Sequence, residues 1–257
     1  MYSLLKLLSI IFTIRAHSIE FSQHHKYHET MTNQKSSVSK LPAKPPTVST
    51  IVGVLEHEII FGQLHPRERL IEDELMRRFG ATRHRVRQAL EELVQVGLAC
   101  QERHKGTQVR DYTTEEVIDL YEIRHALQSQ AISRITFPIS SEVIDQLQRL
   151  NEEHIKSCQS ADLKNIFRLN NEFHEVFFNA CGNKFLIEAI GSYAWRSHPM
   201  RSRGFFNAEY RDQASKEHSE MIEALIAEDR GKLLKLNAVH INRPRDLYIE
   251  NQNRRLS

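Results

Sequence analysis

Cysteine is scarce in this sequence. The 257 residues include three cysteines, Cys100, Cys158 and Cys181, which are widely spaced and form no CxxC pair. An odd number of cysteines without such a pair is typical of reduced cytosolic thiols, and it argues against a disulfide framework or a thiolate metal site. We therefore expect these thiols to fill space in the core or at the surface.

Long apolar runs are also missing. The run over residues 4–14 contains Lys6 and is shorter than the roughly 20 residues that a membrane-spanning helix needs. Together with its flanks it resembles a weak signal peptide. A polar stretch begins at Met31, so the residues before it are an artefact of the assigned start, a disordered extension or a true signal. We prefer the first interpretation, in which Met31 is the true start. We expect residues 1–46 to form a disordered leader and the protein to have no membrane partner.

No excess of one charge dominates the chain, since 35 Lys and Arg stand against 33 Asp and Glu. The charges are unevenly placed, however. Residues 51–75 hold two basic and six acidic side chains, whereas residues 76–110 hold eight basic and three acidic ones. A positive surface confined to so short a segment predicts a local site for a polyanion. It argues against a structural nucleoid protein, which would need a broader basic surface.

The first ordered segment has the pattern of a winged helix-turn-helix. Apolar residues recur with helical spacing over 48–61, and further helices are predicted at 71–79 and 83–96, each followed by a glycine. Thr82 is a good N-cap for the last of these helices. A short hairpin with a polar tip at residues 104–106 follows. Three helices and a wing within about sixty residues predict a DNA-binding domain over 47–112.

The remaining chain, 113–251, is predicted to be an all-helical bundle. Thr113 and Glu116 have the spacing of a capping box and open a helix that lasts to about Ile135. Neither an internal repeat nor a convincing strand is found in this part. The fold class is therefore mainly α, with an N-terminal winged helix-turn-helix domain and a C-terminal helical bundle. The further helices are expected at 141–157, 162–180, 184–195, 208–227 and 232–251.

These segments resemble a known family. The stretch EDELMRRFGATRHRVRQALEEL, with the preceding helix and the wing, resembles the DNA-binding domain of GntR-type bacterial regulators. The stretches EIRHALQSQAI, NNEFHEVFFNACGN and KEHSEMIEALIAEDRGKLLKLNAVHI resemble the FCD effector domain of the FadR-like branch. Arg67 stands where the family usually has glycine, which we expect to alter a turn and not the fold.

The resemblance assigns DNA contacts to the start of the predicted third helix. Arg83 and Arg87 are four residues apart and share a helix face, and arginine suits both guanine edges and phosphates. Arg77 and Arg78, in the preceding helix, are either phosphate contacts or a solvated face. His84 replaces the Pro or Thr of many relatives, so the operator sequence is expected to differ. The DNA-contacting set implied by the resemblance is Thr82, Arg83, Arg85, Arg87, His104, Lys105 and Gly106.

Spacing in the helical part suggests a metal site. Asn170 and His174 lie one helical turn apart, and His218 and His240 lie on two later helices. Three imidazoles and an oxygen donor from a bundle form a possible N3O site for a divalent transition metal. The resemblance implies this ligand set, with Asn170 in place of the commoner Asp. The metal is expected to be Zn, Ni, Mn or Fe.

Arg124 is the candidate for binding an effector. It interrupts an apolar helical pattern, where an unpaired cation is costly to bury. One interpretation is a salt bridge to a neighbouring helix. The other, which the resemblance favours, is an anchor for a small organic acid beside the metal. The same pocket has three weaker candidates, Tyr193, Trp195 and Arg196. Of these, Trp195 is more often a core residue.

We therefore expect a cytoplasmic, nucleoid-associated transcriptional regulator, by family default a repressor. It should bind a palindromic double-stranded operator as a homodimer and respond to a small carboxylate. The alternative is a metal-dependent hydrolase that uses the histidines. That reading lacks an HExxH motif, and its only nearby carboxylates are Glu172, Glu175 and Glu217, most of which should point away. We expect no enzyme activity and no catalytic residue.

Overall fold

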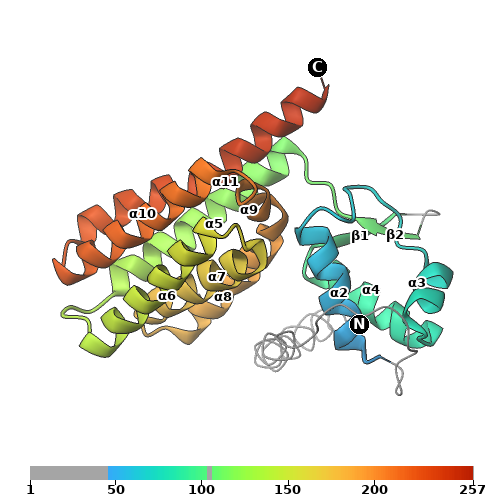
Figure 1. Cartoon of the computed structure of the whole chain (residues 1–257), viewed down its shortest axis with the longest axis horizontal. Helices are drawn as coiled ribbons and strands as arrows, with labels where there is room; N and C mark the ends of the chain where they lie inside the picture. Colours follow the sequence, from blue (N-terminus) through green and yellow to red (C-terminus); the bar gives the residue numbers. More distant parts are fainter. Residues whose placement is uncertain (1–45, 103–105, 257) are drawn as a thin grey trace, which may run out of the picture. The chain divides into compact units, whose positions relative to one another are not determined.

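The computed structural model describes residues 46–102 and 106–256 (Figure 1). The described chain divides into two compact units. One combines the residues up to Val54 with Glu72–Ala89, and the other combines Leu55–Ile71 with the residues from Leu90 onward. Each unit is considered by itself. The expected boundaries, 47–112 and 113–251, stay a prediction.

The first unit contains α3 (Glu72–Phe79) and the beginnings of α2 (Val48–Ile60) and α4 (Arg83–Gln95). The hydroxyl of Thr47 accepts the amide hydrogen of Thr50 at 3.2 Å, which satisfies a free donor at the start of α2. Gly80 has a φ of +60° between α3 and α4, a backbone conformation that glycine adopts without strain. The predicted order of helix, helix, tight turn and helix is confirmed.

The wing belongs to the second unit. Strands β1 (Ala99–Glu102) and β2 (Gly106–Val109) pair antiparallel, with Ala99 opposite Val109. The connection after α2 joins this hairpin, because the amide of Leu70 donates to the carbonyl of Thr107 at 2.9 Å. The winged helix-turn-helix predicted from the sequence is thus present with its small sheet.

Arg67 keeps a glycine-like turn in that connection. Its φ is +69°, in the left-handed region that disfavours residues with a Cβ. Its amide donates to the carbonyl of Val109 at 3.0 Å, and its Nε lies 2.7 Å from Oδ2 of Asp111. Arginine therefore occupies a backbone conformation that favours glycine.

The helical part begins at Thr113, whose side chain accepts the amide of Glu116 while Glu116 accepts the amide of Thr113. The predicted capping box is confirmed. Helix α5 packs against α8 and α11, α6 packs against α7 and α10, and α10 packs against α11 (Figure 1). The helices are α5 (Thr114–Arg134), α6 (Ser141–Gln159), α7 (Leu163–Asn179), α8 (Lys184–Arg196), α9 (His198–Gly204), α10 (Ala208–Ile226) and α11 (Arg230–Leu256).

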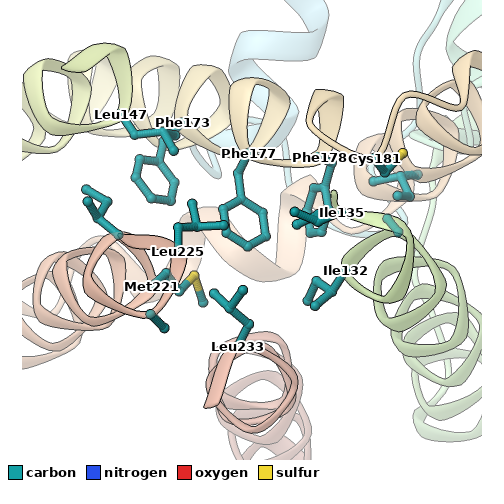
Figure 2. Packing of buried hydrophobic residues seen from close by; sticks show 14 residues of the cluster. Ile132, Ile135, Leu147, Phe173, Phe177, Phe178, Cys181, Met221, Leu225 and Leu233 are labelled. Atoms are coloured by element: carbon teal, nitrogen blue, oxygen red, sulfur yellow. The ribbon is translucent and has the colours of Figure 1, made fainter. Parts of the chain in front are cut away.

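The core of this bundle is aromatic on one side and aliphatic on the other. Figure 2 shows Phe173 and Phe177 of α7 pointing toward Met221 and Leu225 of α10. These side chains are at most 1% exposed, and burial of such groups is the main favourable term in folding. Because His174 follows Phe173 in α7, the core fixes the helix that carries a candidate ligand.

Two features of the bundle differ from the sequence-based expectation. Helix α9 lies in a stretch where no helix was expected, and it carries Arg201. Helix α11 extends from Arg230 to Leu256 and contains Pro244 in its interior. No helix in the described ranges combines the length and the apolar character needed to span a bilayer.

Candidate functional site: an arginine face on α4 and a histidine cluster in the helical bundle

Two arginines of α4 share an exposed face and meet the acidic start of α3. Arg83 lies 2.6 Å from Oδ1 of Asp73 and 3.4 Å from Oε2 of Glu72. Nε of Arg87 lies 3.0 Å from both carboxylate oxygens of Glu72. Ion pairs as exposed as these stabilise a fold only slightly, so both guanidinium groups can exchange their partners for phosphates at small cost.

The other arginine of this stretch points elsewhere. Arg85 is half-buried, and its Nη1 donates to the carbonyl of Pro46 at 3.4 Å. Thr82 caps the helix weakly, since its hydroxyl is 3.5 Å from the amide of Arg85. His84 is exposed beside Arg83. The structure thus places Arg83 and Arg87 together on one face and separates Arg85 from them.

The remaining predicted DNA contacts lie in the wing. Gly106 is exposed and begins β2 with a φ of +80°. His104 and Lys105 lie outside the described residues. In α3, Arg77 and Arg78 are exposed, and Nε of Arg77 donates to the carbonyl of Asp73 at 3.3 Å.

Three histidines from three helices meet inside the bundle. The metal-ligating atoms of His174 in α7, His218 in α10 and His240 in α11 all lie within 4.8 Å of one another. Nε2 of His174 is 3.0 Å from Nε2 of His240. The convergence of these histidines is therefore present, although they are separated in sequence by up to 66 residues.

A carboxylate orients one of these imidazoles. Oε2 of Glu217 accepts from Nδ1 of His240 at 2.8 Å, and Arg243 donates to the other oxygen of Glu217. Because a carboxylate only accepts, His240 carries a proton on Nδ1, and its Nε2 faces Nε2 of His174. Burial by itself would raise the pKa of Glu217, but hydrogen bonds from His240, Gln213 and Arg243 lower it.

Glu217 is thus the exception among the three carboxylates near the histidines. It is 2% exposed and engaged with a histidine of the cluster. Glu172 pairs with Arg168 one turn away, and Glu175 is exposed. A metal-ligating histidine usually donates its second nitrogen to such a carboxylate. The sequence did not assign this role to Glu217.

The histidine cluster has the chemistry of a transition-metal site. Desolvation, followed by the neighbouring His240 ring, lowers the pKa of both His174 and His218 well below 6.5. Both are therefore neutral near pH 7, the state that ligates metals. Among the described residues, neither ring nitrogen of His218 has a hydrogen-bond partner, although the side chain is 0% exposed. A neutral imidazole has one nitrogen with a free lone pair, and a metal ion that accepts this lone pair would fit such a buried, unsatisfied ring.

The fourth predicted ligand, Asn170, lies one turn before His174 in α7 and is 2% exposed. Its amide nitrogen is buried and has no hydrogen-bond partner in the part of the chain that the structure describes. His154 was not singled out from the sequence, yet it is 0% exposed and its ring centroid is 5.2 Å from that of His218. It contacts Ser215 through Nδ1 at 3.0 Å, which indicates a supporting role in the wall of the cluster.

Arg124 forms no salt bridge within the described ranges. It is 6% exposed, and its Nε and Nη1 have no hydrogen-bond partner. Its guanidinium carbon lies 4.8 Å from the ring centroid of Tyr121. The salt bridge to a neighbouring helix, one of the two interpretations of this residue, is not found among the described residues.

Arg201 is a second buried arginine that the sequence analysis did not single out. It is 7% exposed, and its Nη2 donates to Oδ1 of Asn171 at 2.9 Å. Pro199, in the first turn of α9, was the available signal for this helix, since proline is favoured there.

The effector pocket has three weaker candidates from the sequence, Tyr193, Trp195 and Arg196. Arg196 stacks on Tyr193, and Trp195 packs against His198. Their place in a pocket stays a prediction.

Comparison with known proteins identifies two domains. Residues 47–109 match the model of bacterial regulatory proteins of the gntR family, and residues 119–243 match the FCD domain. The chain is 28% identical over 148 residues to the HTH-type transcriptional regulator YdhC of Bacillus subtilis (strain 168). It is 24% identical over 136 residues to the HTH-type transcriptional regulator McbR of Escherichia coli (strain K12). These alignments span 57% and 53% of the chain, and 66% and 62% of the two relatives.

Solved structures share the fold. E. coli McbR/YncC matches with a TM-score of 0.65 and 19% identity, over 84% of this chain and 100% of that one. A transcriptional regulator of GntR type from Rhodococcus sp. RHA1 matches with a TM-score of 0.67 and 17% identity, over 79% and 97%. The resemblance seen in the sequence is thus confirmed, as is the fold class. The matched families and relatives are transcriptional regulators, not enzymes.

Proposed function

Because the chain belongs to the gntR family of bacterial regulatory proteins and carries an FCD domain, we propose that it is a metal-dependent, acid-responsive transcriptional regulator. The observation that carries this proposal is the convergence of three histidines in the same helical domain as an unpaired buried arginine, Arg124. One part of the chain would read DNA and the other would sense a small molecule. By family default, the regulator is a repressor.

The DNA-binding part uses the exposed face of α4. Arg83 and Arg87 leave Glu72 and Asp73 and contact phosphates or guanine edges of an operator. Thr82 and the wing tip contact the backbone nearby, with His104, Lys105 and Gly106 in the minor groove. Arg85 has a smaller role, because it is half-buried and bonded to the carbonyl of Pro46.

The helical part holds a divalent transition metal, Zn, Ni, Mn or Fe, through His174, His218, His240 and Asn170. Glu217 fixes the tautomer of His240, which keeps Nε2 available as a ligand atom. When bound, the metal supplies a Lewis-acidic position for an oxygen of the effector. Asn170 brings no negative charge, which selects for an anionic effector over a neutral one.

The effector is a small carboxylate anchored by Arg124. Nε and Nη1 of Arg124 have no partner in the described residues, and the oxygens of a small acid can accept hydrogen bonds from this guanidinium. Binding would favour one arrangement of α5 and its neighbours, and the two sites would be coupled by the difference in affinity.

A homodimer formed through the helical domain fits this role, because two reading heads match a palindromic operator. Such a regulator works in the cytoplasm, associated with the nucleoid. The metal-dependent hydrolase considered as an alternative is disfavoured by the family, and Glu217 is already engaged with His240 and Arg243, so it is not free to act as a base.

Two measurements test the proposal. Metal content is determined on protein purified without a His-tag, and we expect His218→Ala to lose the metal that the exposed control His125→Ala retains. Binding to DNA from the region upstream of the protein's own coding sequence is then titrated at fixed salt, with and without metal and small carboxylates. Equal metal content in both variants, or operator binding that no metal or acid alters, would contradict the proposal.

A further inference from the structure

Two arginines are buried in the helical domain without a carboxylate partner. Arg124 is 6% exposed and Arg201 is 7% exposed. Nη2 of Arg201 donates to the neutral side chain of Asn171 at 2.9 Å. Within the described ranges, neither guanidinium forms a salt bridge. Since a buried charge is costly unless it is paired, both positions point to a missing anion.

The two arginines belong to one electrostatic environment. Burial, followed by the charge of Arg124, lowers the pKa of Arg201 to about 10. Tyr121 of α5, Met200 of α9 and Ile241 of α11 pack in one buried cluster, so the helices that carry the two arginines and His240 meet there. Arg124 comes from α5 and Arg201 from α9, so two helices deliver like charges to the neighbourhood of the histidine cluster.

The buried side chains in the described part of the chain supply no free negative charge to balance them. Glu217 is the only acidic residue among the buried side chains of the described residues. Its two oxygens are occupied by His240 and Arg243. A divalent metal on the histidines would add two further positive charges, and Asn170 would offset none of them. A monocarboxylate would leave most of this charge without a partner.

We propose that the site binds a dicarboxylate, with one carboxylate at the metal and the second held jointly by Arg124 and Arg201. This inference rests on the proposed metal-dependent, acid-responsive function and narrows its effector to a dianion. Arg201 is then a specificity-determining residue. Guanidinium groups form paired hydrogen bonds with carboxylates, so two of them can hold one carboxylate from different sides.

Tyr121 adds a polar contact to the same place. It lies one turn before Arg124 and is 1% exposed, and its hydroxyl oxygen interacts with the Arg124 guanidinium, but no acceptor for its proton is found among the described residues. A buried hydroxyl whose proton has no acceptor is costly, and an oxygen of the ligand would accept that proton. The unsatisfied donors of Tyr121 and Arg124 therefore share one expected acceptor.

The test measures ligand binding to the metal-loaded full chain by thermal shift and calorimetry. The dicarboxylate probes are malonate, succinate and glutarate. Each is compared with the monocarboxylate of the same length, which is propionate, butyrate or valerate, respectively. Inorganic phosphate is a further probe. We expect at least one dicarboxylate to bind about tenfold or more tightly than its monocarboxylate partner and than phosphate. Equal affinity for both acids of every pair, or tighter binding of phosphate, would overturn the inference.

The variant Arg201→Met removes the guanidinium of Arg201 and keeps that of Arg124, so it tests the role of Arg201 alone. We expect this variant to lose the preference for the dicarboxylate while its affinity for the monocarboxylate changes little. Arg134→Gln, at an exposed position of α5, should retain the wild-type preference. Because removal of an unpaired buried cation relieves a desolvation cost, the ligand-free Arg201→Met chain should melt at or above the wild-type temperature. If it fails to fold, Arg201→Lys keeps the charge without the bidentate fork and should lose most of the preference.

The outcomes distinguish this inference from the function on which it rests. If monocarboxylates alone bind and change operator affinity, the acid-responsive function stands and the dicarboxylate assignment is wrong. A preference for dicarboxylates that persists in both Arg201 variants also overturns the dicarboxylate assignment. If no acid of either series binds or changes operator affinity, both the proposed function and the inference are wrong.

Discussion

Nδ1 of His240 donates a hydrogen bond to Oε2 of Glu217 at 2.8 Å, and Nε2 of the same ring faces Nε2 of His174 at 3.0 Å. A single hydrogen bond therefore decides which nitrogen of His240 is available to a metal. The carboxylate that makes this bond is itself fixed by Arg243.

Glu217→Gln should weaken metal binding. The amide does not favour protonation of Nδ1 as a carboxylate does, and it leaves Arg243 without a counter-charge. We expect metal affinity to fall by about 10- to 100-fold, as measured by competition with a chelator. Glu209→Gln, at an exposed position of the same helix, is the control. Unchanged affinity in the Glu217 variant would show that His240 does not depend on this contact.

Arg87→Ala should remove operator binding and leave the fold intact. The Arg87 side chain is 57% exposed and its ion pair with Glu72 contributes little stability. We expect the affinity for the operator to fall by about tenfold or more, with a shallower salt dependence if the contact is to phosphate. Circular dichroism should match the wild type, and Arg149→Ala, at an exposed position of α6, should bind normally. Wild-type affinity of the Arg87 variant in an anisotropy titration would reject the contact.

Arg67→Gly should stabilise the protein, because glycine adopts the φ of +69° without strain. The ion pair with Asp111 is lost as well, but the Arg67 side chain is 78% exposed and that pair is worth little. Arg67→Ala is the matched control, since it loses the ion pair and keeps the strain. We expect the glycine variant to exceed the alanine variant by about 1 kcal/mol in the free energy of unfolding. Equal denaturation midpoints would argue against stored strain.

Acid should destabilise the metal-free protein. Burial, followed by the electrostatic effect of the His240 ring, lowers the pKa of His154 to about 4, and the pKa values of His174 and His218 are lowered as well. In the unfolded chain these groups take up protons near pH 6.5. The free energy of unfolding therefore falls as the pH drops from about 6.5 toward 4, by up to about 3 kcal/mol from His154.

Melting temperatures measured across that range test this dependence. Substitution of His154 by Leu, which cannot take up a proton in either state, should reduce the slope, whereas the exposed His125→Gln should not. Wild-type and His154→Leu chains with the same pH dependence would contradict the prediction. Metal should oppose the loss as long as it stays bound, because it competes with protons for the same nitrogens.

Much of the fold could be predicted because its signals are local. The periodic apolar residues located the long helices, and the capping box at Thr113 and Glu116 is formed as expected. Helix α9 was missed because seven residues are too few to show a helical period. Arg67 was expected to alter its turn, but hydrogen bonding to Val109 holds the glycine-like conformation.

The sequence by itself determined the recognition helix and the choice of candidate histidines. Arg83 and Arg87 share a face because four residues make about one helical turn, and this needs no knowledge of the rest of the chain. Only the tertiary structure decided that Glu217 orients His240 and that Arg85 is separated from the other two arginines. It also decided that Arg201, like Arg124, is buried with no carboxylate partner among the described residues. These relations join residues whose helices meet through packing, and the direction of a side chain in a packed bundle depends on its neighbours from every helix.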